Sequence, residues 1–437
     1  MATEREEREE RAHGRRPMSG RDPDETGRVA TPLELLYDLT FVVAFGTAAD
    51  QFAKYLAMGH IRAAVIGFLF AAFAICWAWV NYSWFASAYD TDDWVCRLLT
   101  MVQMIGVVVL ALGLQQMFES VERDASLQNG VMVGGYVVMR VGMVLLWGRA
   151  GWHDRDRRRI AKTYIWTIST SQVGWVLLFL AQLPVTTSLA IATLLLLIEL
   201  AGPWIAEHKK GRGGTPWHPH HIAERYGLLV IITLGEGVIG TVAALNAVVH
   251  GPAGWSVNAV LVAVAGIGLT FGMWWMYFAI PFGELRHADR RRAFSFGYGH
   301  LLIFGAIVAT GGGLLAAARY LEHQSLIGPV STVTSVAAPV AVFTLALFAI
   351  WTTLVGEQDP FHLALLVAAG AVLLLSVLLA SWGVSMAGCL VVVACAPIVT
   401  VIGFETVGHR HLTEAMERLR PREAVHDPDA AVRSEAT

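Results

Sequence analysis

Long apolar runs dominate this sequence and constrain its fold more than any other feature. A helix needs about 20 mostly apolar residues to cross the hydrocarbon core of a bilayer. Hydrophobic residues make up 55% of the chain and charged residues only 15%, whereas soluble domains carry about 25% charged residues. One water-soluble globule cannot bury so much apolar surface. The sequence therefore predicts an all-α polytopic membrane protein and excludes a disordered chain, a disulfide scaffold and an ordinary cytosolic enzyme.

About twelve runs are long enough to be transmembrane helices. Their approximate limits are 32–54, 62–86, 96–117, 129–148, 160–181, 186–206, 222–246, 256–280, 295–318, 330–354, 361–381 and 385–406. Twelve is an even number, so both termini are expected on the same side of the membrane. Residues 1–30 are predicted to form a disordered charged tail, and residues 408–437 a second charged tail.

The basic residues support this count. With twelve spans, 27 of the 32 Lys and Arg residues fall on the side of the two tails and four on the other, while Arg140 lies inside a span. A missed span would invert every later loop and destroy this contrast. Because basic loops stay in the cytoplasm, both termini are predicted to be cytoplasmic, in a bacterial inner (plasma) membrane.

The chain also shows signs of an internal duplication. The first and seventh spans, PLELLYDLTFVVAFG and IAERYGLLVIITLGE, both carry an acid at the cytoplasmic entrance, and the second and eighth both carry two tryptophans followed by a tyrosine. The offset stays near 190–200 residues. We predict two six-helix halves of parallel topology, residues 31–210 and 211–407, with chance likeness among apolar helices as the alternative. In transporters built this way, the site lies where the halves meet.

Ionisable residues within the spans are the strongest candidates for function. Each costs about 2.5–3.5 kcal/mol on insertion scales, so such residues usually mark a pathway or a buried pair. Glu34 and Asp38 stand four apart and share a helix face. The candidates for transport or ion coupling are Glu34, Asp38, Arg140, Glu199, Glu224, Glu236 and His300.

Depth in the membrane groups these candidates further. At ~1.5 Å per residue, Asp38 lies roughly 10 Å from the cytoplasmic boundary, and Arg140 and Glu199 roughly 12 Å. These three side chains are therefore expected to meet, with Asp38 or Glu199 as the partner of Arg140. The pair is either a fixed ion pair that holds helices together or a pair that switches during gating or coupling. Glu236 lies deeper, at about 20 Å. No basic residue of its own helix lies at its level, which favours a proton carrier or cation ligand. A neutral acid bonded to a neighbouring helix is the alternative.

Weaker signals lie near the cytoplasmic loops. The loop candidates are Asp90, Asp92, Asp93, His221 and Arg225. The DTDD segment could attract a divalent cation, but capping of the next helix is the commoner role of such acids. The histidines of HKKGRGGTPWHPHH lack a completing Cys or carboxylate cluster. We therefore predict no metal site and no cofactor.

Motifs of enzymes and of nucleic-acid binding are missing from the sequence. There is no Walker A, HExxH or GxSxG pattern and no basic stripe with interleaved aromatic residues. An enzyme stays an alternative that would need a carboxylate–His site such as Glu224 with His221. The predicted partners are the lipid bilayer and a small solute or cation of unknown identity, with no nucleic acid. The sequence leaves a homo-oligomer open.

Several segments resemble a known family. TPLELLYDLTFVVAFGTAA, DTDDWVCRLLTMVQMIGVVVLALGL, the YVVMR run and HIAERYGLLVIITLGEGVIG are similar to segments of the bacterial low temperature requirement protein A family. The likeness runs from about residue 30 to 320, and more loosely to about 407. It implies a multi-spanning bacterial inner-membrane protein and a link to growth or stress adaptation in the cold, without implying an activity. After WWMYF, where the family often carries an acid, this chain has Ala279. The residues most typical of the family are Glu34, Asp38, Asp90, Asp92, Asp93, Arg140, His221, Glu224, Arg225 and Glu236.

The leading hypothesis is a secondary transporter coupled to protons or cations. Glu236 is the predicted coupling carboxylate, Glu34 and Asp38 line the cytoplasmic passage, and Arg140 is the switching counter-ion. A cation channel that uses the same acids as a filter is one alternative. The other is a membrane sensor or stress-adaptation protein without transport, which predicts fully paired charges and sealed helices.

Overall fold

The computed structural model is all-helical over the part of the chain that it describes, which is residues 16–23, 25–123, 126–208, 214–251, 254–285, 292–356 and 358–419. Each of the twelve predicted spans corresponds to one long helix. The first six are α2 (Pro32–Ala57), α3 (Ile61–Tyr89), α4 (Trp94–Arg123), α5 (Gly130–His153), α6 (Arg158–Leu180) and α7 (Val185–Glu207). The second six are α8 (Pro219–Val249), α9 (Val257–Phe278), α11 (Arg292–Leu321), α12 (Pro329–Val355), α13 (Pro360–Ser381) and α14 (Met386–Gly403).

Three short elements complete the described chain. Helix α10 (Phe282–Leu285) follows α9, and the π-helix η1 (Phe404–Gly408) joins α14 to the last helix, α15 (His409–Leu419). Eleven of the long helices of the described residues are long and apolar enough to cross a membrane, which confirms a polytopic membrane protein. The twelfth long helix, α6, is not among them. It begins with basic residues and carries hydroxyl and amide side chains through its middle.

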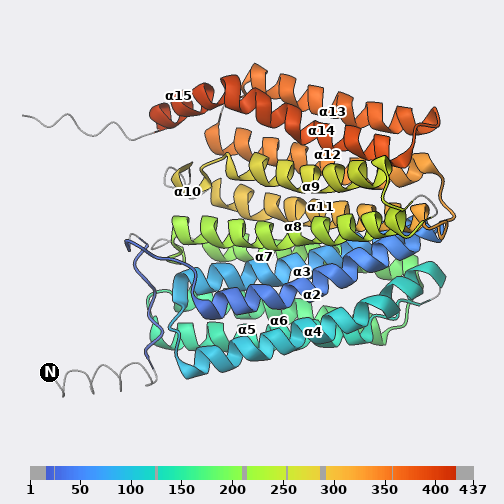
Figure 1. Ribbon diagram of the computed structural model, residues 1–437. Coiled ribbons are helices and arrows are strands. Elements are labelled where there is room, and N and C mark those ends of the chain that lie inside the picture. Colours follow the sequence, from blue (N-terminus) through green and yellow to red (C-terminus); the bar gives the residue numbers. More distant parts are fainter. Residues whose placement is uncertain are drawn as a thin grey trace, which may run out of the picture.

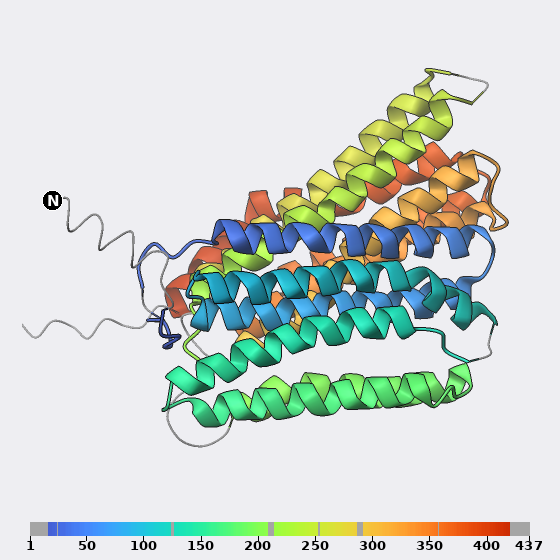
Figure 2. The same cartoon turned by 90° about the horizontal axis from the view of Figure 1, so that it is seen from below.

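The long helices pack side by side in one bundle (Figure 1). Helix α2 contacts α3 and α4 as well as α8 and α11, and α3 also contacts α8 and α11. Helices α2 and α3 of the first set of six and helices α8 and α11 of the second set therefore form the boundary between the two sets. Helices α6 and α7 pack against each other along one flank, where they run the length of the bundle (Figure 2).

The two ends of the bundle differ in the elements that they carry. Helix α2 begins at the same end of the bundle at which α15 lies (Figure 1). We call it the terminal end, and the opposite end of the helices the far end. That the terminal end faces the cytoplasm stays a prediction from the basic residues.

Burial separates central from peripheral helices. In the most apolar stretch of α11, 78% of the residues are buried, against 22% in α13. Helix α13 nevertheless exposes leucine and valine along its length. A helix that is apolar on its exposed face as well as on its buried face is adapted to lipid rather than to water.

The N-terminal tail was predicted to be disordered, but part of it packs against the bundle. The Arg21 N–H donates to the carbonyl of Ala88 at 2.9 Å, and Arg28 Nη2 donates to the carbonyl of Ala86 at 3.0 Å. The last carbonyls of a helix lack partners within the helix and carry partial negative charge. The tail therefore follows the C-terminal end of α3. Residues 1–15 and 420–437 of the two predicted tails lie outside the described residues.

Candidate functional site

The start of α2 holds Glu34 in a defined position. The Glu34 N–H donates to Thr31 Oγ1 at 3.3 Å, and the Thr31 N–H donates to Glu34 Oε2 at 2.8 Å. This reciprocal capping box and Pro32 in the first turn begin the helix. Glu34 Oε1 takes no part in this capping box and is left for a partner on another helix.

That partner is Arg225 of α8. Arg225 Nη1 donates to Glu34 Oε1 at 2.7 Å, and Nη2 donates to Asp38 Oδ1. His221 Nε2 lies 3.3 Å from Glu34 Oε2, and Trp79 Nε1 of α3 donates to Asp38 Oδ1 at 2.7 Å. The charged side chains are at most 1% exposed. An i,i+4 pair on α2 thus faces an i,i+4 pair on α8, and we call these residues, with Trp79, the Arg225 network.

This arrangement corrects the predicted meeting of Asp38, Arg140 and Glu199. The partner of Asp38 is Arg225, which the sequence suggested only as a loop candidate at the start of a span. Equal depth was a poor guide, because depth along a helix does not reveal which helices are neighbours. Helix α2 packs against α8, so its acids meet a guanidinium of α8 rather than Arg140 of α5.

Arg140 forms a separate network within the first six helices. Arg140 Nη2 lies 3.0 Å from Glu199 Oε2 of α7, and the Tyr136 hydroxyl donates to the same oxygen at 2.7 Å. Gln172 and Trp175 of α6 donate to Glu199 Oε1 at 3.2 and 3.0 Å. We call this set, joining α5, α6 and α7, the Arg140 network. Of the two partners predicted for Arg140, the structure has Glu199.

Glu236 is the exception among these buried charges. It lies on α8, is 2% exposed, and has no hydrogen-bond or ion-pair partner among the described residues. Small residues surround it. A Cβ on Gly46 of α2 would lie 3.2 Å from Glu236 Oε1, and a Cβ on Gly311 of α11 would lie 2.6 Å from the backbone carbonyl carbon of Glu236. Glu236 therefore lies at the tight crossing of α2, α8 and α11, with its carboxyl group against α2.

A second ion pair joins α2 to α11 at the far end. Arg319 Nη2 lies 2.6 Å from Asp50 Oδ1, and these side chains are 25% and 52% exposed. On α2, Gly46 stands between Asp38 and Asp50 in the sequence. The contact with Glu236 is thus flanked by a buried charge network on one side and an exposed ion pair on the other.

Comparison with known proteins identifies the family of this chain. Residues 29–397 match the family described as bacterial low temperature requirement A protein (LtrA). The chain belongs to this family. One curated relative is an uncharacterized protein of Rhizobium meliloti (strain 1021), 28% identical over 293 residues. The match covers 63% of this chain and 66% of the relative. With its spanning helices, this LtrA family member is a multi-pass membrane protein of a bacterial family.

The DTDD segment of this LtrA family member caps a helix and ties loops together. Asp93 Oδ1 accepts the Cys96 N–H at 3.0 Å, as an N-cap does. Asp93 also accepts hydrogen bonds from Arg149 of α5 and from the Arg16 N–H. Burial acts to raise the pKa of Asp93, but these bonds outweigh it and hold the pKa below its usual range.

The other two acids of this segment have local partners. Asp92 forms an exposed ion pair with Arg97 at 3.0 Å. Asp90 Oδ1 accepts the Asp92 N–H at 3.0 Å, and burial raises the pKa of Asp90. None of these contacts requires a cation.

Two further candidates have other hydrogen-bond partners among the described residues. His300 is fully buried, with Nδ1 2.8 Å from the Phe296 carbonyl and Nε2 2.9 Å from the Tyr277 hydroxyl. A carbonyl only accepts, so Nδ1 carries a proton and donates to Phe296. Glu224 is half-buried and accepts the Ala30 N–H at 3.2 Å.

An aromatic cavity of about 220 Å³ opens at the terminal end. Glu207 of α7 is the acidic residue among those that line the cavity, and its carboxylate accepts hydrogen bonds from Tyr164 and Thr215. The Trp147 Nε1 group is buried and has no hydrogen-bond partner among the described residues. The cavity lies between α3, α5, α6, α7 and α11. Its ring-bearing lining residues are Trp77, Trp84, Trp147, Tyr164, His208, Trp217, Phe294 and Tyr298.

Several members of these sites were not predicted from the sequence. Trp79, Tyr136 and Trp175 are hydrogen-bond donors to the buried acids, but an aromatic residue in an apolar helix carries no separate signal of that role. A group formed by Asp359, His362 and His411 was also missed. Its members are up to 52 positions apart, so no local motif marks them.

Proposed function

We propose that this LtrA family member is a secondary transporter coupled to protons or cations, with Glu236 as the coupling carboxylate. The observation that carries the proposal is that Glu236 is buried, without a partner among the described residues, at the crossing of α2, α8 and α11. An unpaired carboxylate in an apolar environment is costly, and a bound proton or cation removes that cost. Such a group can load and unload as the helices around it move.

The proposal includes two six-helix halves, residues 31–210 and 211–407, of parallel topology. The contacts between helices within each half support this duplication. The pairs α2–α3, α2–α4, α4–α5, α5–α6 and α6–α7 have counterparts in α8–α9, α8–α11, α11–α12, α12–α13 and α13–α14. The halves also differ, because α3 contacts α4 and α5 in the first half, whereas α14 contacts α9 and α12 in the second. Glu236 then lies at the interface of the halves, where transporters of this plan bind their ions.

In this mechanism the ion pairs across the interface act as gates. The Arg225 network joins α2 to α8 at the terminal end, and the Asp50–Arg319 pair joins α2 to α11 at the far end. Separation of the halves at one end breaks one gate while the other holds. Arg225, rather than Arg140, is then the switching counter-ion of Glu34 and Asp38. The aromatic cavity, lined by helices of both halves, is the proposed route of solute from the cytoplasm.

The test is ion flux in proteoliposomes. The protein is reconstituted with a trapped pH-sensitive dye, and proton movement is followed under imposed Na⁺ or K⁺ gradients. Glu236→Gln is expected to abolish the coupled movement. Glu405→Gln is the matched control, because that carboxylate is exposed and accepts a bond from Trp275 Nε1 at 2.8 Å. Undiminished coupling in Glu236→Gln removes Glu236 from this role.

Two alternatives have distinct outcomes in the same preparation. A channel gives single-channel currents without saturable turnover. A membrane sensor without transport gives no flux in the wild-type protein, and the buried ion pair between Arg140 and Glu199 favours that alternative. The inner membrane, with both termini cytoplasmic, is the proposed location, because the basic loops gather at the terminal end.

A further inference from the structure

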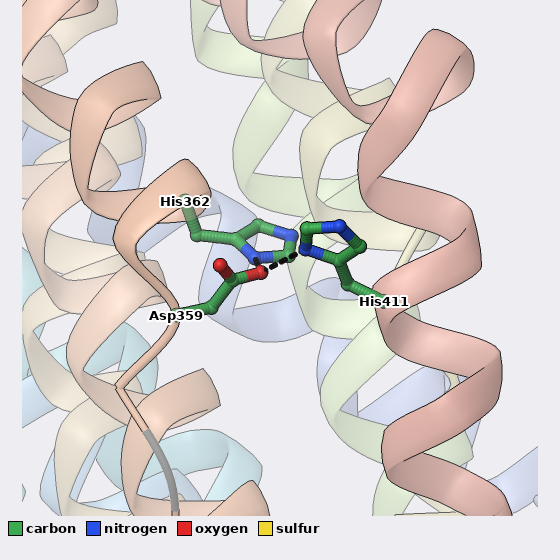
Figure 3. A group of neighbouring side chains, drawn as sticks. All are labelled: Asp359, His362 and His411. Atoms are coloured by element: carbon green, nitrogen blue, oxygen red, sulfur yellow. Dashed lines mark hydrogen bonds and ion pairs between the residues drawn. The ribbon is translucent and has the colours of Figure 1, made fainter.

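Three metal-ligating side chains converge where α13 and α15 meet (Figure 3). Asp359 precedes α13, His362 lies in its first turn, and His411 comes from α15. His362 Nδ1 lies 2.6 Å from Asp359 Oδ2, and His411 Nδ1 lies 2.5 Å from the same oxygen. Two imidazole nitrogens thus point at one carboxylate oxygen from different helices.

Local structure positions each of these groups. Asp359 Oδ1 accepts the Phe361 N–H at 2.9 Å as the N-cap of α13, which fixes the carboxylate and turns Oδ2 toward the histidines. His362 follows three residues later on the same helix. The π-helix η1 lies directly before α15 and alters the helical register there. His411, three residues beyond η1, directs its Nδ1 atom toward Asp359.

The geometry points to a binding site for Zn²⁺, and we propose that Asp359, His362 and His411 hold this ion. Two imidazoles and one carboxylate are typical zinc ligands, and three protein ligands leave a fourth position for water. Magnesium and calcium prefer sets of oxygen atoms and are poorly suited to two imidazoles. The ligands lie apart from Glu236 and the Arg225 network, so zinc binding does not depend on transport.

The short distances within this group are those of hydrogen bonds. Each Nδ1–H can donate to Asp359 Oδ2, which explains the separations. Binding of Zn²⁺ requires that both Nδ1 atoms lose their protons, to solvent or by a shift to Nε2, and that the three ligand atoms move apart around the ion. All three ligand atoms already lie within 4.8 Å of one another.

The surroundings of the three ligands determine how Zn²⁺ can reach the site and what its binding changes. The side chains of His362, Asp359 and His411 are 13%, 22% and 40% exposed, so an ion can enter from the terminal end. Bound Zn²⁺ would tie α15 to α13. The ring centroid of Trp351 lies 5.7 Å from that of His362 and offers a fluorescent reporter.

The experiment is a Zn²⁺ titration of the full chain in detergent, after removal of any affinity tag and treatment with a chelator. Calorimetry is expected to show one site. Co²⁺ should give visible absorption bands of a low-symmetry site and quench Trp351, and Mg²⁺ should do neither. His411→Ala should weaken Zn²⁺ binding at least about tenfold, since loss of even an outer partner of a metal ligand costs that much.

His409→Ala is the matched control. It removes an exposed histidine from the same helix, whose Nδ1 lies 3.4 Å from the Phe404 carbonyl, and should leave binding unchanged. Asp359→Asn keeps a helix-capping side chain but removes the charge, and should also weaken binding. Equal Zn²⁺ affinity in the wild type, His411→Ala and Asp359→Asn, or no Zn²⁺ binding by the wild type, would overturn the proposal and leave a hydrogen-bonded contact between α13 and α15.

Discussion

The Arg225 and Arg140 networks have the same chemistry and a different place in the bundle. Each pairs a buried guanidinium with an acid that also accepts an indole N–H, from Trp79 in one case and Trp175 in the other. The Arg225 network joins α2 and α3 to α8, which lie on opposite sides of the boundary between the two sets of six helices. The Arg140 network joins α5, α6 and α7 within the first set.

The difference in position shows how one kind of interaction can serve two purposes. A charge pair within one rigid group of helices keeps its geometry when that group moves, so it acts as a clip. A charge pair between two groups is broken and remade by the same movement. Under the proposed function, both networks support the fold and only the Arg225 network takes part in gating.

The largest expected effect comes from removal of either guanidinium alone. Arg225→Ala strands Glu34 and Asp38, and Arg140→Ala strands Glu199. Leaving a buried charge uncompensated should lower the free energy of unfolding by about 3–5 kcal/mol in either case. Denaturation in detergent and the yield of monodisperse protein measure this. A loss of less than about 1 kcal/mol in one variant, the size expected of an exposed pair, would show that water reaches that network.

Removal of all charges of a network sharpens the comparison. Arg140→Met with Glu199→Gln should recover most of the stability lost in Arg140→Ala, because no charge is stranded, and should leave coupled flux intact. Arg225→Met with Glu34→Gln and Asp38→Asn should also recover stability but abolish coupled flux. Flux and thermal unfolding are measured on the same preparations. Equal flux in the two combined variants would end the distinction between clip and gate.

The two indole groups give a matched pair of smaller changes. Trp79→Phe and Trp175→Phe each keep an aromatic ring and remove one hydrogen bond to an acid, which should cost about 1.5–3 kcal/mol when the acceptor is charged. The stability losses should be similar. Only Trp79→Phe should change the dependence of flux on the ion gradient. A change of the same size in Trp175→Phe would contradict the assignment.

The smallest effect on stability is expected at the far end. Asp50→Asn removes an exposed ion pair with Arg319, which should cost about 0.2–1 kcal/mol. High salt should reduce that cost, since it screens exposed charges. If the pair is a gate, flux should change more than the unfolding temperature does. Stability at low and high salt, together with flux, provides the measurement.

Much of the fold could be predicted from local patterns. The twelve apolar runs correspond to twelve long helices because a spanning segment must satisfy its own backbone hydrogen bonds, and this requirement is local to each run. The i,i+4 spacing of Glu34 and Asp38 placed them on one face for the same reason. Glu236 was singled out because no basic residue of its own helix lies at its level, and it has no partner among the described residues.

Other features needed the packing of helices. Asp38 was assigned a neighbour by depth, but depth says nothing about the rotation and contacts of separate helices. The packed segment before α2 was missed because its charges resemble those of a disordered tail, while its partners are carbonyls at the end of α3. Asp359 and His411 come together only through the path of α14 and η1.

The sequence by itself determined that this chain crosses a membrane many times, which segments form its long helices, and which side chains are costly to bury in a bilayer. These are properties of single helices in a bilayer, set by length, apolarity and charge. Only the tertiary structure decided which charges pair, that Arg225 rather than Arg140 meets Asp38, and that three ligands gather at α13 and α15. Those outcomes depend on side-chain contacts between distant segments, which no local pattern encodes.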